Sequence, residues 1–270
     1  MKLIKVSTLI LGIASIPCAF ADEVITIAAS AVPHAQILKQ VKPMLKKQGI
    51  DLQIKEFDDY IQPNLLVDQK RLDANFIQHR PYLAQFNKER GTKLVELVAV
   101  HIEPMGIYAS DNPKLADFIK TKNKAKLSKE LIVGVPNDTT NEGRALQLLE
   151  KNGLIKIKSG VVYPTRKDII DNPHKLIIKE LDPAMLPRML KASQLDLAVI
   201  NSNFAIQAKF NPLKDAILIE NAKSPYVNII AVRADDANKP KLKKLAAAIK
   251  TETIKKYIQT AYNNSIVPVN

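Results

Sequence analysis

The hydrophobic pattern of the chain repeats one order of elements in its two halves. An apolar, β-branched run at 24–29 is followed by helical periodicity over 34–47 and by a second apolar run at 52–57. Much later, an apolar run at 131–135 is followed by helical periodicity and by another apolar run at 176–181. Strands that alternate with helices predict an α/β fold, and the repetition predicts two similar lobes with a ligand cleft between them.

The two copies also share short stretches of sequence. Ile-Lys-Glu-Phe at 54–57 matches Ile-Lys-Glu-Leu at 178–181, and each is followed by a helical stretch and a Leu-Asp pair that opens a strand. The pattern between and after the copies predicts further strands at 73–77, 94–100, 106–109, 197–200 and 227–232, and helices at 64–69 and 81–88.

The end of the chain, 240–262, predicts two lysine-rich helices. A chain that crosses between two lobes twice would return these helices to the first lobe. We therefore expect the first lobe to comprise 22–108 together with 230–270, and the second lobe to comprise 109–229.

The first residues have the pattern of a secretory signal. Lysines at positions 2 and 5 precede an apolar run at 9–16, which is too short to span a membrane. Ala-Phe-Ala at 19–21 matches an A-x-A cleavage site. We expect residues 1–21 to be removed as a signal peptide and the mature protein to begin at Asp22 in the periplasm.

Cys18 is the only cysteine of the chain, so the protein has no structural disulfide. Cleavage before Cys18, in place of cleavage after Ala21, would make this cysteine the lipid-bearing N-terminus of a membrane-anchored lipoprotein. Pro17 stands where the lipid-attachment pattern has a small flexible residue. The secreted form is therefore our expectation, and the lipoprotein anchored through Cys18 remains the alternative.

The formal charge of +13 raises the question of a nucleic-acid partner, and removal of Lys2 and Lys5 with the signal would leave +11. The lysines are spread over predicted helix faces and are interleaved with acidic residues. The densest run, 114–129, has no accompanying pattern of aromatic stacking residues. We therefore expect solvated basic faces and no nucleic-acid partner.

The polar loop at 136–144 follows a strand and opens a helix. The free N–H groups of a helix N-terminus favour an anion, and Arg144, one turn into the helix, is placed to add a two-pronged bond to a carboxylate. Either Thr140 or Asn141 is a suitable cap for this helix. The alternative is an ordinary capped helix whose Arg144 lies in solvent or pairs with Glu142, which composition alone favours.

Two other strand ends carry candidate binding residues. Phe76, His79 and Tyr82 could line a pocket for an apolar side chain, although core packing explains the aromatic rings equally well. Asn201 and Asn228 each follow or begin a predicted strand, and asparagine can hold an ammonium or a carboxylate. Taken singly, each asparagine is better explained as a turn residue.

Signatures of an enzyme are absent from the sequence. There is no G-x-S-x-G and no H-E-x-x-H motif. His101 and Glu103 could ligate a metal together with His79, but their spacing is not specific. We expect no catalysis, no cofactor and no metal, and a secreted hydrolase or metal-dependent enzyme remains a second, disfavoured alternative.

Taken together, motifs spread over nearly all of the mature chain resemble the methionine-binding NlpA lipoprotein family, the substrate-binding subunits of bacterial methionine ABC importers. The matching stretches are Asp-Tyr-Ile-Gln-Pro-Asn at 59–64, Leu-Asp-Ala-Asn at 72–75, Gln-His-Arg-Pro-Tyr-Leu at 78–83, Glu-Pro-Met-Gly-Ile-Tyr at 103–108, Val-Pro-Asn-Asp at 135–138 with Gly-Arg at 143–144, Gly-Leu-Ile at 153–155, Asn-Pro at 172–173, Leu-Pro-Arg at 186–188, Leu-Ala-Val-Ile-Asn at 197–201 and Ser-Pro-Tyr-Val-Asn at 224–228.

The resemblance implies a two-lobed periplasmic binding protein of type II, each lobe a mixed sheet flanked by helices. It implies a monomer that captures methionine between its lobes and delivers it to the permease and ATPase of an ABC transporter, without a cofactor. The resemblance also implies roles for individual side chains. Arg144 resembles the arginine that pairs with the ligand's α-carboxylate, and the residues that would hold the rest of the amino-acid head are Asn141, Asn201 and Asn228.

The resemblance further implies that the thioether pocket is built from Tyr60, Phe76, His79 and Tyr82. Relatives commonly have two aromatic residues before the Gln-His pair, whereas this chain has Phe76 and Ile77. That departure leaves a methionine-containing dipeptide, or another apolar amino acid, as an alternative ligand.

Overall fold

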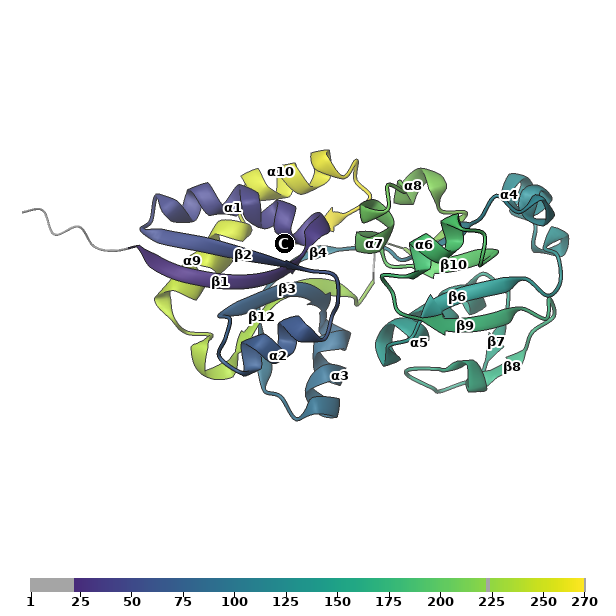
Figure 1. The fold of residues 1–270 in the computed structure, drawn as a ribbon, viewed down its shortest axis with the longest axis horizontal. Helices are drawn as coiled ribbons and strands as arrows, with labels where there is room; N and C mark the ends of the chain where they lie inside the picture. Colours follow the sequence, from purple (N-terminus) through teal and green to yellow (C-terminus); the bar gives the residue numbers. More distant parts are fainter. Residues whose placement is uncertain (1–21, 222–223, 270) are drawn as a thin grey trace, which may run out of the picture.

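Two separate β-sheets, each flanked by helices, form the core of the computed structural model, which describes residues 22–221 and 224–269 (Figure 1). The first sheet has six strands. In spatial order they are β13 (Val267–Pro268), β4 (Leu94–Ile102), β12 (Val227–Arg233), β3 (Ala74–His79), β1 (Glu23–Ser30) and β2 (Ile50–Phe57).

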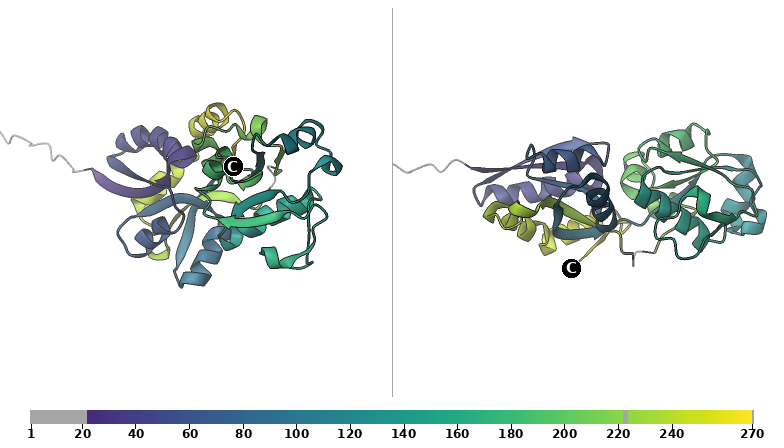
Figure 2. Two further views of the ribbon diagram at one scale, coloured as in Figure 1. Left: turned by 45° about the vertical axis from the view of Figure 1, so that its right-hand side comes forward. Right: turned by 90° about the horizontal axis from the view of Figure 1, so that it is seen from below.

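The second sheet has five strands and lies beside the first, as two further orientations also show (Figure 2). Its spatial order is β11 (Leu218–Ile219), β5 (Gly106–Ala109), β10 (Leu197–Ile200), β6 (Ile132–Pro136) and β9 (Ile177–Leu181). A short antiparallel pair, β7 (Lys156–Ile157) and β8 (Ile169–Asp171), stands apart from it. Both main sheets contain parallel and antiparallel pairs, so the predicted fold class, an α/β protein of two mixed sheets flanked by helices, is confirmed.

Helices cover both faces of each sheet because each face carries apolar side chains. On the first sheet, one face is covered by α1 (Gln36–Lys46), α9 (Pro240–Ile249) and α10 (Glu252–Ala261), and the other by α2 (Gln62–Asp68) and α3 (Arg80–Arg90). On the second sheet, α4 (Ala116–Thr121) and α5 (Thr139–Lys151) cover one face, and α6 (Leu186–Lys191) and α7 (Ser202–Gln207) cover the other. The remaining helical turns are Ala31–Ala35, Pro113–Leu115, Lys124–Lys126, Arg166–Asp168, α8 (Pro212–Asp215) and Ala234–Asp236.

The repeat seen in the sequence has a structural counterpart. In the first sheet β1 lies between β2 and β3 and runs parallel to both. In the second sheet β6 lies between β9 and β10 and runs parallel to both. Each copy therefore contains βαβ units of parallel strands. The carboxyl ends of the three parallel strands lie side by side, and ligands of open α/β sheets bind beyond such ends.

The chain crosses between the sheets twice. The first crossover, 103–105, joins β4 to β5, and the second joins β11 to β12 and includes the described residues 220–221 and 224–226. All of Gly106–Ala109 pairs in the second sheet, and all of Val227–Arg233 pairs in the first. Strand pairing thus favours crossings a few residues before the boundaries expected from the sequence, after residue 108 and after residue 229.

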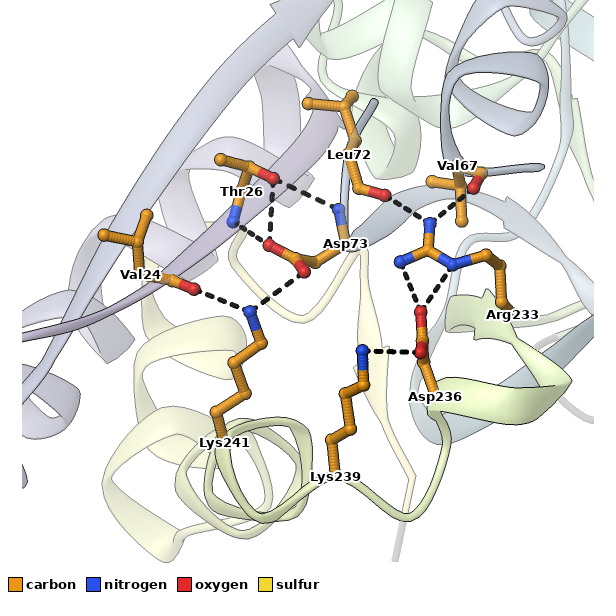
Figure 3. Close-up of polar contacts among 9 residues, drawn as sticks. All are labelled: Val24, Thr26, Val67, Leu72, Asp73, Arg233, Asp236, Lys239 and Lys241. Atoms are coloured by element: carbon orange, nitrogen blue, oxygen red, sulfur yellow. Dashed lines mark hydrogen bonds and ion pairs between the residues drawn. The ribbon is translucent and has the colours of Figure 1, made fainter. Parts of the chain in front are cut away.

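Partly buried charges tie the start of α9 to the first sheet (Figure 3). The carboxylate of Asp73 accepts hydrogen bonds from the backbone N–H of Thr26 at 2.8 Å and from Nζ of Lys241, on α9, at 2.9 Å. Nearby, Arg233 donates to the carbonyl oxygen of Leu72 at 2.6 Å and pairs with Asp236. Apolar residues of both α9 and α10 also pack against the first sheet.

The predicted signal segment, 1–21, and with it Cys18, lies outside the described residues. Within the described part of the chain, no helix combines the length and the hydrophobicity that crossing a bilayer requires.

Candidate functional site

A narrow pocket lies between the two sheets, next to both crossovers. Its empty space, counting the mouth that opens to solvent, is about 340 Å³. Its wall comes from both lobes: His34, Tyr60, Ile77, Gln78, His79, Tyr82, Glu103, Asn141, Arg144, Asn201, Ser202, Asn203 and Asn228.

The pocket brings together all but one of the candidate residues that the sequence suggested: Tyr60, His79, Tyr82, Asn141, Arg144, Asn201 and Asn228. Phe76 is fully buried behind the wall, and its ring lies edge-on to that of His34 with 4.5 Å between the centroids. The next residue, Ile77, lines the pocket. Successive side chains of a strand point to opposite faces, which explains why one of these two residues faces the core and the other the pocket.

Asp138 caps the helix α5, whereas the sequence suggested Thr140 or Asn141. The carboxylate of Asp138 accepts from the backbone N–H of Asn141 at 3.0 Å. It also accepts from the side-chain amide nitrogen of Asn141 at 2.9 Å. This bond orients the amide so that its oxygen points away from Asp138. This oxygen accepts from Nε2 of His79 at 3.1 Å and from the amide of Asn201 at 2.9 Å. Asn141 therefore links the two lobes.

The N–H of Tyr82 donates to Nδ1 of His79 at 3.1 Å, so His79 caps α3 and carries its own proton on Nε2. Burial and, to a smaller extent, the positive charge of Arg144 lower the pKa of His79 from 6.5 to about 3. The imidazole is thus neutral, as both of its hydrogen bonds require.

Arg144 is 3% exposed and makes its two-pronged bond with Glu220, not with the neighbouring Glu142. The Nε atom donates to one carboxylate oxygen of Glu220 at 3.1 Å and Nη2 donates to the other at 2.5 Å. Nη2 also donates to the carbonyl oxygen of Glu103 at 2.8 Å, and the guanidinium lies 4.1 Å from the ring centre of Tyr226. The carboxylate of Glu142 instead accepts from the backbone of Arg166 at 3.0 Å.

A buried acid stands near Arg144 in the same pocket. The carboxylate of Glu103 accepts from Nε2 of His101 at 2.6 Å and lies 3.4 Å from Nε2 of His34. Burial raises the pKa of Glu103, but His34, His101 and Arg144 together bring it below its ordinary value. Burial lowers the pKa of His34 to about 4, although Glu103 opposes that shift. Glu103 is therefore an anion beside a neutral His34.

His34, His101 and Glu103 are also the residue types that bind a divalent metal, and their donor atoms lie within 4.8 Å of one another. The sequence suggested His79 as the third member of such a group. The structure places His34 there instead, and His79 is committed to Tyr82 and Asn141.

Sequence reasoning missed Glu103 and His34 as wall residues, together with Ser202 and Asn203. Glu103 follows β4 directly, and His34 follows β1. The rule that ligands lie beyond strand carboxyl ends would have selected both, but the sequence does not say which strand ends meet.

The wall has complementary parts. Arg144 offers a buried positive charge, Glu103 a buried negative charge, and Tyr60 and Tyr82 an apolar surface with their ring centres 5.8 Å apart. A small zwitterion with an apolar side chain fits this set. A pocket of this kind between two α/β lobes defines the class of periplasmic substrate-binding proteins.

Comparison with known proteins agrees with that class. The model of the NlpA lipoprotein family matches residues 25–270. The chain is 39% identical over 250 residues to the methionine-binding lipoprotein MetQ of Bacillus subtilis, covering 91% of this chain and 88% of that protein. This chain belongs to the NlpA lipoprotein family.

Two solved structures share the fold. One is a nutrient-binding protein of Burkholderia cenocepacia bound to methionine, with a TM-score of 0.84 and 40% identity over 91% of this chain and all of that one (100%). The other is an ABC transporter periplasmic substrate-binding protein of Coxiella burnetii, with a TM-score of 0.82 and 36% identity over 91% of this chain and 100% of that one.

Proposed function

We propose that this protein binds methionine between its lobes and delivers it to an ABC transporter. The observation that carries the proposal is that buried Arg144 and buried Glu103 line one pocket together with the rings of Tyr60 and Tyr82. The names of the Bacillus and Burkholderia relatives support methionine as the ligand, and the name of the Coxiella protein supports the transporter. These relatives are binding proteins by name, in keeping with a role without catalysis.

In this proposal each charge of the ligand meets an opposite charge. Arg144 binds the α-carboxylate, and Glu103 receives the ammonium together with the amide oxygens of Asn201 and Asn228. Tyr60 and Tyr82 pack against the thioether, which is polarizable and favours contact with aromatic rings.

The lobes would close around the ligand. We assign 22–102 and 227–269 to the first lobe and 106–219 to the second, following the strand pairing. Hydrogen bonds already bridge them, from Tyr60 to Asn203 at 2.7 Å and from His79 to Asn141 at 3.1 Å. Methionine shifts the equilibrium toward the closed form by its differential affinity for that form, and the closed monomer is what the transporter recognises.

The protein would act outside the cytoplasmic membrane, as a secreted protein or one anchored through Cys18. Mass spectrometry of the mature N-terminus distinguishes the two forms. A chain that begins at Asp22 supports secretion, and a lipid-bearing Cys18 supports the anchor.

Calorimetric titration of ligand-free protein with L-methionine tests the ligand. Submillimolar binding is expected, and Arg144→Ala should weaken it by about 2–5 kcal/mol because a buried carboxylate loses its partner. Arg80→Ala is the matched control, since Arg80 forks to Glu96 in the same way but on the surface. Competition with D-methionine, methionine dipeptides and leucine defines specificity. Absence of L-methionine binding would reject methionine, and unchanged affinity in Arg144→Ala would remove that residue from the site.

A further inference from the structure

Within residues 22–221 and 224–269, the hydrogen-bond and stacking partners of the Arg144 side chain lie on the two crossovers between the lobes. Nη2 donates to the carbonyl oxygen of Glu103, on the first crossover, at 2.8 Å. Glu220 and Tyr226, which supply the carboxylate and the stacked ring, lie on the second crossover. The guanidinium thus contacts described residues of both segments that connect the two sheets.

Glu220 is itself fixed to the first crossover. Its backbone N–H donates to the carbonyl oxygen of Met105 at 2.9 Å, and its carboxylate accepts from the N–H of Met105 at 3.1 Å. The two crossovers are joined at this point, and the side chain of Glu220 is 15% exposed. The carboxylate of Glu220 is thus fixed by a backbone N–H and by Arg144. It therefore does not occupy Arg144 in the place of a ligand carboxylate.

The donors of Arg144 can be accounted for one by one. Guanidinium has five N–H groups. The Nε proton and both protons of Nη2 are used by Glu220 and the carbonyl of Glu103. Among the described residues, no hydrogen bond is made by Nη1, and Arg144 lines the pocket. Within the described part of the chain, Nη1 is thus the guanidinium nitrogen without a hydrogen-bond partner, and the bonds to Glu220 fix the orientation of the group.

We infer that Glu220 is a positioning residue that holds Arg144 on the joined crossovers and thereby couples the ligand's carboxylate to closure of the lobes. This inference rests on the proposed function, because it assigns a carboxylate ligand to Nη1. A ligand carboxylate bound to Nη1 interacts with a guanidinium that is hydrogen-bonded to both crossovers. Binding then favours one arrangement of the crossovers, which is the differential interaction that closure requires.

Glu220→Gln tests the inference because it keeps the size of the side chain and removes the charge. Methionine affinity, measured by calorimetry, should fall about 10- to 100-fold, the loss expected when a hydrogen bond between charged groups is weakened. Ligand-induced compaction, measured by small-angle X-ray scattering at saturating methionine, should shrink. The control is Glu96→Gln, which breaks the equivalent fork to Arg80 on the surface and should change neither quantity.

A second pair of variants addresses the stacked ring. Tyr226→Leu removes the aromatic face from the guanidinium and should weaken methionine binding by about 2- to 10-fold, whereas Tyr226→Phe keeps the face and should bind nearly as the parent does. If Glu220→Gln does not fold, this pair still tests whether the crossover contacts set the affinity. Equal affinity of the Leu and Phe variants would contradict the inference.

A measurement without ligand separates this inference from the proposed function. The side-chain Nε–H of Arg144, held by Glu220, should give a nitrogen NMR signal that is protected from solvent exchange, identified by its loss in Arg144→Lys. The signal should lose its protection in Glu220→Gln and keep it in Glu96→Gln. If the parent protein binds no methionine, the proposed function fails while this result still decides whether Glu220 positions Arg144. Unchanged protection, or tighter methionine binding by Glu220→Gln, would overturn the inference.

Discussion

Replacing His79 with asparagine should change how the stability of the protein depends on pH. In the folded protein His79 is 5% exposed and its Nδ1 accepts the N–H of Tyr82 at the start of α3. Protonation would remove that acceptor and place a second positive charge near Arg144. Asparagine also accepts hydrogen bonds as a helix cap but does not titrate. The substitution therefore removes one titration while keeping the cap.

The sign and size of the effect follow from the pKa of His79, which falls from 6.5 in the unfolded chain to about 3 in the folded protein. The stability contributed by neutral His79 is fully present above the unfolded pKa. It declines as the pH falls from 6.5 toward 3, because only the unfolded chain takes up the proton in that range. The loss is about 1.4 kcal/mol per pH unit and reaches about 2 kcal/mol near pH 5.

Urea unfolding followed by circular dichroism measures this loss. The free energy of unfolding is obtained at about pH 8 and about pH 5 for the parent and for His79→Asn. The parent should lose about 2 kcal/mol more than the variant over that interval. His34, whose pKa is lowered to about 4, titrates in both proteins and cancels in the difference. Since His79→Asn also loses the bond to Asn141, the pH dependence is compared, not the absolute stability.

The reasoning fails if the two proteins lose the same free energy between the two pH values. Equal losses would mean that His79 titrates alike in the folded and unfolded chain, and hence that its surroundings do not penalise the imidazolium. The conclusion that His79 is neutral in the pocket wall would then be wrong.

Two further predictions concern the framework of the lobes. Asp73→Asn should lower the free energy of unfolding by about 1–3 kcal/mol at neutral pH, because Asp73 holds Thr26 and Lys241. These bonds hold its pKa below the ordinary value despite partial burial, so the penalty should shrink as the pH falls through that pKa, and a pH-independent penalty would argue against it. Gly134→Ala should cost about 1–3 kcal/mol in thermal or urea unfolding, since the new methyl would lie 2.5 Å from Leu195 in a packed core. A fully neutral Gly134→Ala would mean that this core relaxes freely.

The sequence alone determined much of the architecture. Apolar runs with a period of two or of 3.6 residues depend on local geometry, so strands and helices, and their repetition in two βαβ units, could be predicted from the pattern. The same applies to the polar strand ends that carry Asn141, Arg144 and Asn201, because they directly follow or begin those elements. The motifs spread along the chain also identified the family, which the family model confirms.

Only the tertiary structure decided which side chains of the site contact one another. Arg144 pairs with Glu220, 76 residues away, and not with nearby Glu142, because the folded chain brings Glu220, which follows β11, beside α5. Glu103 entered the wall for the same reason. Phe76 faces the core and Ile77 faces the pocket, because strand register sets which of two successive residues lies on which face of the sheet. Periodicity reports a residue's own element, whereas charge pairing depends on which distant elements become neighbours.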